Sequence, residues 1–214
     1  MVLKNKKELE NIKKLFLKHY KNKKTELNYK NDYELLIAII LSAQCTDKRV
    51  NIITPKLFEK YPNIDALANA KLEDVKEIIK TCSFFNNKTK NIINMAKIIK
   101  EKFNSKIPTT HKDLISLPGV GNKSANVFLI ELFNENKMAV DTHVYRASHR
   151  LGITDAKSVI ETEKDLIQAF KTNLNELHQA FVLFGRYKCK AKNPECNECF
   201  VKKYCISKET FKAK

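Results

Sequence analysis

The sequence predicts an all-α fold, and two observations support that class. Apolar residues recur at helical spacing along most of the 214 residues, whereas the alternating pattern typical of half-buried strands is nearly absent. A hydrophobic fraction of 43% and a charged fraction of 30% are ordinary for a chain that buries a packed core. The length allows one large domain or two small lobes and excludes a many-domain protein.

Each amphipathic or apolar run is expected to form a helix. The helix ends are expected near proline, glycine or polar turn residues. Pro55 lies inside the third run and can kink or shorten that helix, because proline has no backbone N–H. Segments 35–41 and 127–130 are apolar on every side, so both are expected at the centre of the fold. In chain order the expected helices cover 7–20, 33–43, 47–61, 64–70, 72–81, 88–103, 111–116, 123–133, 142–151, 159–171 and 176–187.

The charge is strongly positive, with 40 Lys and Arg against 24 Asp and Glu and a formal net charge of +16. Such an excess attracts polyanions, so DNA, RNA or an anionic membrane surface are the expected partners. The N-terminus has no apolar signal core, and the longest apolar run, Leu35–Leu41, is too short to span a bilayer. We therefore expect a cytoplasmic protein whose thiols stay reduced.

Two of the four glycines fall in one segment, Leu-Pro-Gly-Val-Gly-Asn-Lys-Ser-Ala at residues 117–125. A Pro-Gly-x-Gly connection between two helices makes a tight hairpin that needs unusual φ values and points the next helix's first N–H groups outward. Those groups and the positive end of the helix can bind a nucleic-acid phosphate. The alternative is an ordinary turn between helices, with glycine present for steric reasons.

The segment resembles the helix-hairpin-helix of the DNA glycosylase superfamily, in which Gly119, Val120 and Gly121 would contact the DNA backbone. The typical motif differs only in having threonine where this chain has Ser124. The superfamily also has an aspartate in the segment that follows. Asp141 supplies it, within Val-Asp-Thr-His-Val-Tyr-Arg at residues 140–146.

The spacing of Lys123 and Asp141 also predicts that the two residues lie close together. The helix 123–133 advances about 15 Å, and an extended return along 136–141 covers about 16 Å back. A lysine in the first turn of an apolar helix is desolvated and faces the helix's positive end, and both effects favour the neutral, nucleophilic amine. The alternative is a buried ion pair in which Asp141 caps the next helix.

Four of the six cysteines lie close together near the C-terminus: Cys189, Cys196, Cys199 and Cys205. Four clustered thiolates can hold a zinc ion or a [4Fe-4S] cluster. Zinc ribbons usually have two Cys-x₂-Cys knuckles and this stretch has one, so the spacing alone favours iron–sulfur only slightly. Cys45 and Cys82 lie in helical or apolar settings and are interpreted as ordinary core residues.

The cysteine spacing, directly after Phe-Gly-Arg-Tyr at residues 184–187, resembles the cluster loop of the endonuclease III family and its adenine-specific mismatch relatives. With the hairpin and Asp141, the resemblance to bacterial endonuclease III covers essentially the whole chain. It implies an all-α fold of two helical lobes with a C-terminal [4Fe-4S] loop. The expected limits are a six-helix lobe at 25–135, and a second lobe of 1–24 and 136–214 that carries the cluster loop at 189–205.

Two further segments resemble DNA-contacting loops of this family. Leu-Ser-Ala-Gln-Cys-Thr-Asp at residues 41–47 is similar to a motif whose glutamine, here Gln44, enters the gap left by a flipped nucleotide. Residues 79–88 resemble the loop that wedges the opposite strand. Phe84 would be the wedge, although this chain departs from the family in having Ser83 where a glycine is usual. For Gln44 the alternative is a hydrogen bond to local backbone.

The resemblance implies a bifunctional DNA glycosylase and abasic-site lyase that removes oxidised pyrimidines from duplex DNA in base excision repair. The damaged nucleotide leaves the stack. Lys123 then attacks the sugar C1′ and displaces the base, while Asp141 either accepts the amine's proton or stabilises positive charge on the sugar. β-Elimination from the resulting Schiff base cuts the strand 3′ to the lesion. His143 and Lys192 are further expected DNA contacts, the latter on the cluster loop.

Two other functions compete with this one. An adenine-specific mismatch glycosylase shares the cysteine spacing, but it normally lacks a lysine at the position of Lys123 and has a further C-terminal domain, which this sequence does not show after Cys205. A non-catalytic DNA-binding or redox-sensing protein could use the same hairpin and cluster without needing Lys123 and Asp141. The expected partner is double-stranded DNA with oxidised pyrimidines or abasic sites, bound by a nucleoid-associated monomer with no membrane contact.

Overall fold

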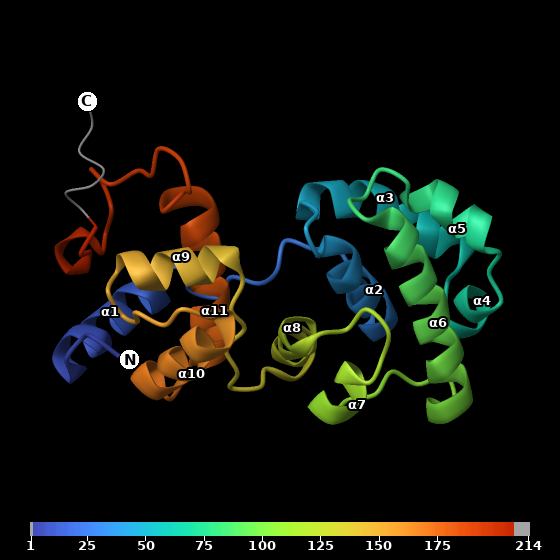
Figure 1. Ribbon diagram of the computed structural model, residues 1–214, viewed down its shortest axis with the longest axis horizontal. Helices are drawn as coiled ribbons and strands as arrows, with labels where there is room; N and C mark the ends of the chain where they lie inside the picture. Colours follow the sequence, from blue (N-terminus) through green and yellow to red (C-terminus); the bar gives the residue numbers. More distant parts are fainter. Residues whose placement is uncertain (1, 208–214) are drawn as a thin grey trace. The chain divides into compact units, whose positions relative to one another are not determined.

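The computed structural model describes residues 2–207, which form eleven α-helices, one π-helical turn and one short 3₁₀ helix (Figure 1). No β-strand occurs among these residues, and the only strand-like pairing within them is an isolated bridge between Val2 and Thr154. The all-α prediction is therefore confirmed. None of the helices in this part of the chain is long and apolar enough to cross a membrane.

All of the expected helices are present, and their ends agree with the predicted ranges to within a few residues. Pro55 lies inside the third helix, which continues to Lys60, so the proline does not shorten it. The last helix gives way to a π-helical turn, where the sequence predicted a continuous α-helix to residue 187. In chain order the elements are α1 (Lys6–His19), α2 (Asp32–Ser42), α3 (Asp47–Lys60), α4 (Ile64–Ala68), α5 (Leu72–Ile79), α6 (Phe85–Phe103), α7 (His111–Ile115), α8 (Asn122–Phe133), α9 (Thr142–Arg150), α10 (Val159–Phe170), α11 (Leu174–Leu183), η1 (Phe184–Lys188) and η2 (Lys202–Tyr204).

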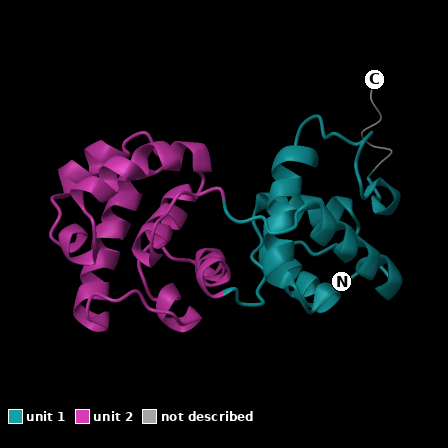
Figure 2. Cartoon of the chain, turned by 180° about the vertical axis from the view of Figure 1, so that it is seen from behind, with its two compact units in different colours: residues 1–25, 134–214 teal, residues 26–133 magenta. Residues whose placement is uncertain are grey.

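The chain divides into two compact units (Figure 2). Unit 1 comprises residues 1–25 and 134–214, and unit 2 comprises residues 26–133. The N-terminal helix α1 therefore belongs with the C-terminal part of the chain, while α2 to α8 form the other unit.

The core of unit 2 is built around α2. No residue from Leu35 to Leu41 is more than 2% exposed, because α2 contacts α3, α6 and α8 on different sides. Residues Ala125–Ile130 of α8 are also buried. A helix that is apolar all round is stable in water only when its neighbours cover every face, and both helices predicted to be central are covered in this way.

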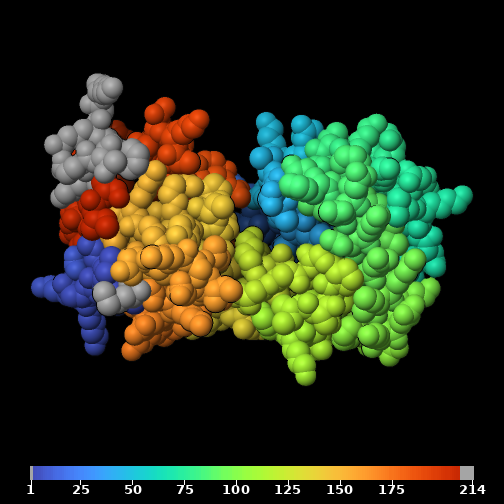
Figure 3. Space-filling model, viewed as in Figure 1, coloured from blue at the N-terminus to red at the C-terminus, as the bar shows by residue number. Residues whose placement is uncertain are grey.

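The core of unit 1 joins the two ends of the chain. Phe16 of α1 stacks on Phe181 of α11 with ring centroids 4.1 Å apart, and it meets Phe184 and Phe200 edge to face. In the space-filling view the blue N-terminal residues lie against red and orange C-terminal ones (Figure 3). Aromatic pairs of this kind add to the free energy gained by burial, so α1 is held firmly against the segment that carries the cysteines.

Candidate functional site

The predicted hairpin connects α7 and α8 in unit 2. Its turn is closed by the backbone N–H of Val120, which donates to the carbonyl of Leu117 at 3.1 Å. Gly119 has a φ of +82°, and a Cβ at this position would lie 3.0 Å from Asn91 Cβ. Gly119 is therefore glycine for both conformational and steric reasons. The side chain of Val120 is buried beneath the turn.

Gly121 differs from Gly119 in both its backbone conformation and its steric surroundings. Its φ lies outside the left-handed region, and a Cβ there would meet no atom within 4 Å. The unusual φ that the sequence predicted for the hairpin thus falls on Gly119 alone. Packing within unit 2 does not require glycine at position 121, and the exposed backbone there is open to an approaching group.

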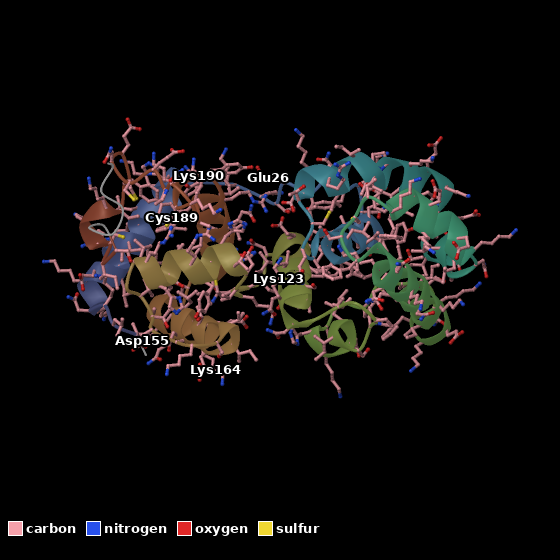
Figure 4. All side chains as sticks on the ribbon, turned by 45° about the horizontal axis from the view of Figure 1, so that its top comes forward. Glu26, Lys123, Asp155, Lys164, Cys189 and Lys190 are labelled. Carbon is pink, nitrogen blue, oxygen red and sulfur yellow. The ribbon has the colours of Figure 1, made fainter. Side chains whose placement is uncertain are left out.

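Lys123 lies in the first turn of α8, directly after the hairpin, and is labelled in Figure 4. Helix α8 begins where the N–H of Ala125 donates to the carbonyl of Gly121 at 3.0 Å. The Lys123 side chain is half-buried, as is Ser124, and residues 125–130 after them are buried. The hairpin, the helix N-terminus and the predicted nucleophile therefore form one local arrangement, as the sequence indicated.

Asp141 is the N-cap of α9 in unit 1. Its Oδ1 accepts hydrogen bonds from the backbone N–H groups of His143 at 2.8 Å and Val144 at 2.9 Å. This is the capping role that the sequence left as the alternative. Both bonds end on Oδ1, so the cap does not occupy Oδ2. Lys123 belongs to unit 2, and its predicted closeness to Asp141 stays a prediction.

His143 follows Asp141 in the first turn of α9. Its Nδ1 lies 3.2 Å from Nη2 of Arg146. Arg146 also donates to the carbonyls of Gly185 at 2.6 Å and Cys189 at 3.0 Å. These bonds tie the start of α9 to the segment that leads into the cysteine cluster.

Two exposed loops of unit 2 carry the predicted DNA-opening residues. Gln44, just after α2, has a φ of +54°, and Phe84, just before α6, has a φ of +57° and is 62% exposed. Left-handed backbone is costly for residues other than glycine and is frequent at functional sites. The loops meet through Cys45 and Cys82, whose sulfur atoms lie 3.4 Å apart.

The four C-terminal cysteines line one cavity together with Arg150, Leu151 and Phe184. Cys189, labelled in Figure 4, follows the π-helical turn η1. Each cysteine of a [4Fe-4S] cluster binds a different iron, so the cluster needs four thiols around one space. A shared cavity with four thiols fits the cluster.

Without a metal the cysteines favour the neutral thiol. Burial raises the pKa of the Cys199 and Cys205 thiols, and the neighbouring thiols raise it further, so a bound cation would favour their thiolate forms. Nη1 of Arg150 lies 3.5 Å from Cys189 Sγ and donates to the carbonyl of Lys190 at 2.7 Å. Sequence reasoning missed Arg146 and Arg150. Their signal was an i, i+4 pair of arginines in a chain with few of them.

Two lysines in and beside the cluster loop form ion pairs with a glutamate of the same loop. Lys188 and Lys190 lie 3.3 Å and 2.7 Å from the carboxylate of Glu195, and these contacts hold the pKa of Glu195 below its usual value. Lys192, the predicted DNA contact, is exposed. Surface ion pairs are weak, so Lys188 and Lys190 can exchange Glu195 for a phosphate at small cost.

Two family descriptions match the sequence. Residues 37–193 match the HhH-GPD superfamily of base excision DNA repair proteins, and residues 189–205 match the iron–sulfur binding domain of endonuclease III. The chain is 44% identical to the endonuclease III of Rickettsia felis, over 91% of this chain and 92% of that protein. It is 42% identical to the endonuclease III of Bacillus subtilis, over 84% and 83%.

Solved structures agree with these relatives. The chain is similar to a non-covalent endonuclease III–DNA complex and to a trapped endonuclease III–DNA covalent intermediate. Each has a TM-score of 0.90 and 36% identity and covers 97% of this chain and 98% of the solved chain. A thermostable thymine-DNA glycosylase with 19% identity shares the fold at a TM-score of 0.84.

Proposed function

Because the chain belongs to the endonuclease III family of base excision DNA repair proteins, we propose that Lys123 and Asp141 carry out its reaction. The protein is a bifunctional DNA glycosylase and abasic-site lyase that acts on oxidised pyrimidines in duplex DNA. The observation that carries the proposal is Lys123 itself. It is half-buried in the first turn of α8, directly after a hairpin suited to a DNA phosphate.

The reaction proceeds through a covalent enzyme–DNA intermediate. The neutral amine of Lys123 attacks C1′ of the extruded nucleotide, the bond to the base breaks, and the base leaves with the bonding electron pair. Asp141 accepts the proton that the amine loses, or stabilises positive charge on the sugar as the bond breaks. Its Oδ2 is outside the helix cap and is the oxygen suited to this role. The C1′–O4′ bond of the sugar ring then opens, which gives a protonated Schiff base between Lys123 and C1′. The Schiff base acidifies the 2′ hydrogen, a base takes that proton, and β-elimination breaks the C3′–O bond and expels the 3′ phosphate.

The hairpin residues Gly119, Val120 and Gly121 hold the DNA backbone next to this site. In support, a Cβ at Gly121 would meet no protein atom within 4 Å, which leaves room for a phosphate close to the backbone. His143 and the exposed Lys192 contribute further contacts from unit 1.

Gln44 and Phe84 keep the duplex open while the damaged nucleotide is extruded. Both are exposed, both have left-handed backbone, and their loops meet through Cys45 and Cys82. An exposed apolar wedge and a polar side chain that fills the vacated space together offset an unstacking cost of a few kcal/mol.

The protein carries a [4Fe-4S] cluster, whose ligands we assign to Cys189, Cys196, Cys199 and Cys205. When bound, the cluster links four points of a loop that has little regular secondary structure. The links constrain the loop that carries Lys192 between Cys189 and Cys196. We also place the protein in the cytoplasm at the nucleoid, where its DNA substrate lies and where thiols are kept reduced.

Borohydride trapping tests the assignment of the nucleophile. The native protein should form a covalent adduct with duplex DNA that contains an abasic site or thymine glycol. Lys123→Gln should abolish the adduct while DNA binding survives. Lys112→Gln, at an exposed lysine of α7, removes the same charge and should leave trapping intact. Efficient trapping by Lys123→Gln would assign the reaction to another amine.

A further inference from the structure

Lys88 is a buried lysine that the reaction does not use. It lies in the first turn of α6 and is only 6% exposed. Its Nζ donates to two backbone carbonyls, at 2.8 Å to Leu41 and at 2.7 Å to Ala43. Within residues 2–207 its Nζ forms no ion pair with a carboxylate, and burial lowers its pKa. A desolvated cation without a carboxylate partner is costly unless its hydrogen bonds compensate.

The two acceptors of Lys88 mark the end of α2. Leu41 lies in the last turn of the helix and Ala43 is its C-cap. Carbonyls at a helix C-terminus lack intrahelical partners and carry partial negative charge, so a lysine ammonium there is favourable. Cys82 adds a weaker contact, with its Sγ 3.7 Å from the carbonyl of Leu41.

The residue after Ala43 is Gln44, whose backbone is left-handed. This conformation costs roughly 1–2 kcal/mol for a residue with a Cβ, so the surroundings must hold it in place. A hydrogen bond from Cys45 N–H to the carbonyl of Ser42 closes the turn on one side of Gln44. Lys88 fixes the peptide on the other side, through the carbonyl of Ala43.

The backbone of Lys88 fixes the second loop as well. Its N–H donates to the carbonyl of Phe84 at 3.1 Å, which is the first hydrogen bond of α6. Phe84 is the N-cap of that helix, and it too is left-handed. One residue thus holds Phe84 through its main chain and the Gln44 turn through its side chain.

We propose that Lys88 is a positioning residue for duplex opening, which fixes Gln44 and Phe84 relative to each other without touching the DNA. The inference rests on the roles proposed for those two residues. It assigns to the Lys88 side chain a specific effect, namely the geometry of the Gln44 turn.

The test compares Lys88→Met with Lys90→Met, which removes a lysine from an exposed position of the same helix. Two cleavage rates are measured for each variant, one on a thymine-glycol duplex and one on an abasic site in a single strand. Lys88→Met should lose about tenfold or more on the duplex, since small displacements of positioned groups cost that much. It should stay near native on the single strand, where no stack has to be opened. Lys90→Met should not change the ratio of the two rates.

Hydrogen exchange gives a readout that does not depend on DNA. The amides of residues 44–46 should exchange faster in Lys88→Met than in the native protein or in Lys90→Met. If Lys88→Met does not fold, Lys88→Gln retains an NH2 donor group without the charge and should show the same selective loss, at smaller size. Equal losses on both substrates, or exchange unchanged at residues 44–46, would overturn the proposal.

A double variant separates this inference from the roles of the loops themselves. If Lys88 acts through Gln44, Lys88→Met should add little to the duplex defect of Gln44→Ala. If Gln44→Ala and Phe84→Ala show no selective duplex defect, the roles proposed for Gln44 and Phe84 in duplex opening fail. If Lys88→Met adds its full duplex defect to that of Gln44→Ala in the double variant, Lys88 does not act through Gln44. A selective defect in Gln44→Ala with a native ratio in Lys88→Met overturns only the positioning role.

Discussion

Cys45 Sγ lies 3.4 Å from Cys82 Sγ, although the two residues are 37 positions apart in the sequence. The contact joins the turn after α2 to the end of α5, next to the two exposed loops of unit 2. Cys82 is buried, as the sequence predicted for a core residue, but Cys45 is only partly so. The two thiols should therefore differ in reactivity.

Alkylation by iodoacetamide at pH 8 should modify Cys45 well before Cys82. Burial and, to a lesser extent, the hydrogen bond with Cys45 raise the pKa of Cys82 to about 12. Because only the thiolate reacts with iodoacetamide, Cys82 should react slowly at pH 8. The thiolate fraction of Cys82 grows as the pH rises toward that value, so the difference should narrow in alkaline buffer. Peptide mass spectrometry of the cluster-loaded protein measures both rates, and equal rates at pH 8 would contradict this prediction.

Asp141 has a structural role and a proposed chemical role that two substitutions separate. Asp141→Asn keeps an acceptor for the amides of His143 and Val144, so its unfolding free energy should stay near native. Asp141→Ala should lose about 1 kcal/mol with the cap. Both should slow base removal by about 100-fold or more.

Ser158→Ala is the matched control for the cap, because Ser158 caps α10 of the same unit through the N–H of Glu161. It should lower stability without slowing base removal. Urea unfolding and single-turnover kinetics supply the two measurements. A native rate in Asp141→Asn would limit Asp141 to capping.

The two hairpin glycines should respond differently to alanine. Gly119→Ala places a Cβ at a φ of +82° and 3.0 Å from Asn91 Cβ, so we expect a loss of roughly 1–2 kcal/mol in unfolding free energy. Gly121→Ala meets open space and should stay within about 0.5 kcal/mol of native. If a phosphate approaches Gly121, this variant should nevertheless bind abasic duplex several-fold more weakly. Native DNA affinity in a folded Gly121→Ala would leave the glycine without a DNA role.

Iron analysis and a ligand substitution test the cluster. Purified protein should hold about four iron atoms per chain, as four thiolates on one cubane require. Cys199→Ser should lose iron and speed hydrogen exchange in unit 1 around Phe16 and Phe200, since metal-binding energy is folding energy. Unit 2 has its own core and should be affected less. Active, colourless protein with one zinc ion would contradict the assignment.

The sequence by itself determined the helical class, the positions of the helices, the hairpin at residues 117–125 and the four-cysteine loop. These features are local: helical periodicity, glycine in a tight turn and ligand spacing are all written in short stretches of chain. The same holds for Lys123 at the start of an apolar helix, because a helix fixes which residues occupy its first turn.

Only the tertiary structure decided how distant segments support one another. It showed that packing requires glycine at position 119 but not at position 121, because Asn91 of another helix lies 3.0 Å from the place that a Cβ of residue 119 would occupy. Lys88 was one lysine in a chain rich in them, and its role became visible when packing placed its Nζ on the carbonyls of Leu41 and Ala43. Such contacts arise from side-chain packing between elements far apart in sequence, which local propensity and spacing do not encode.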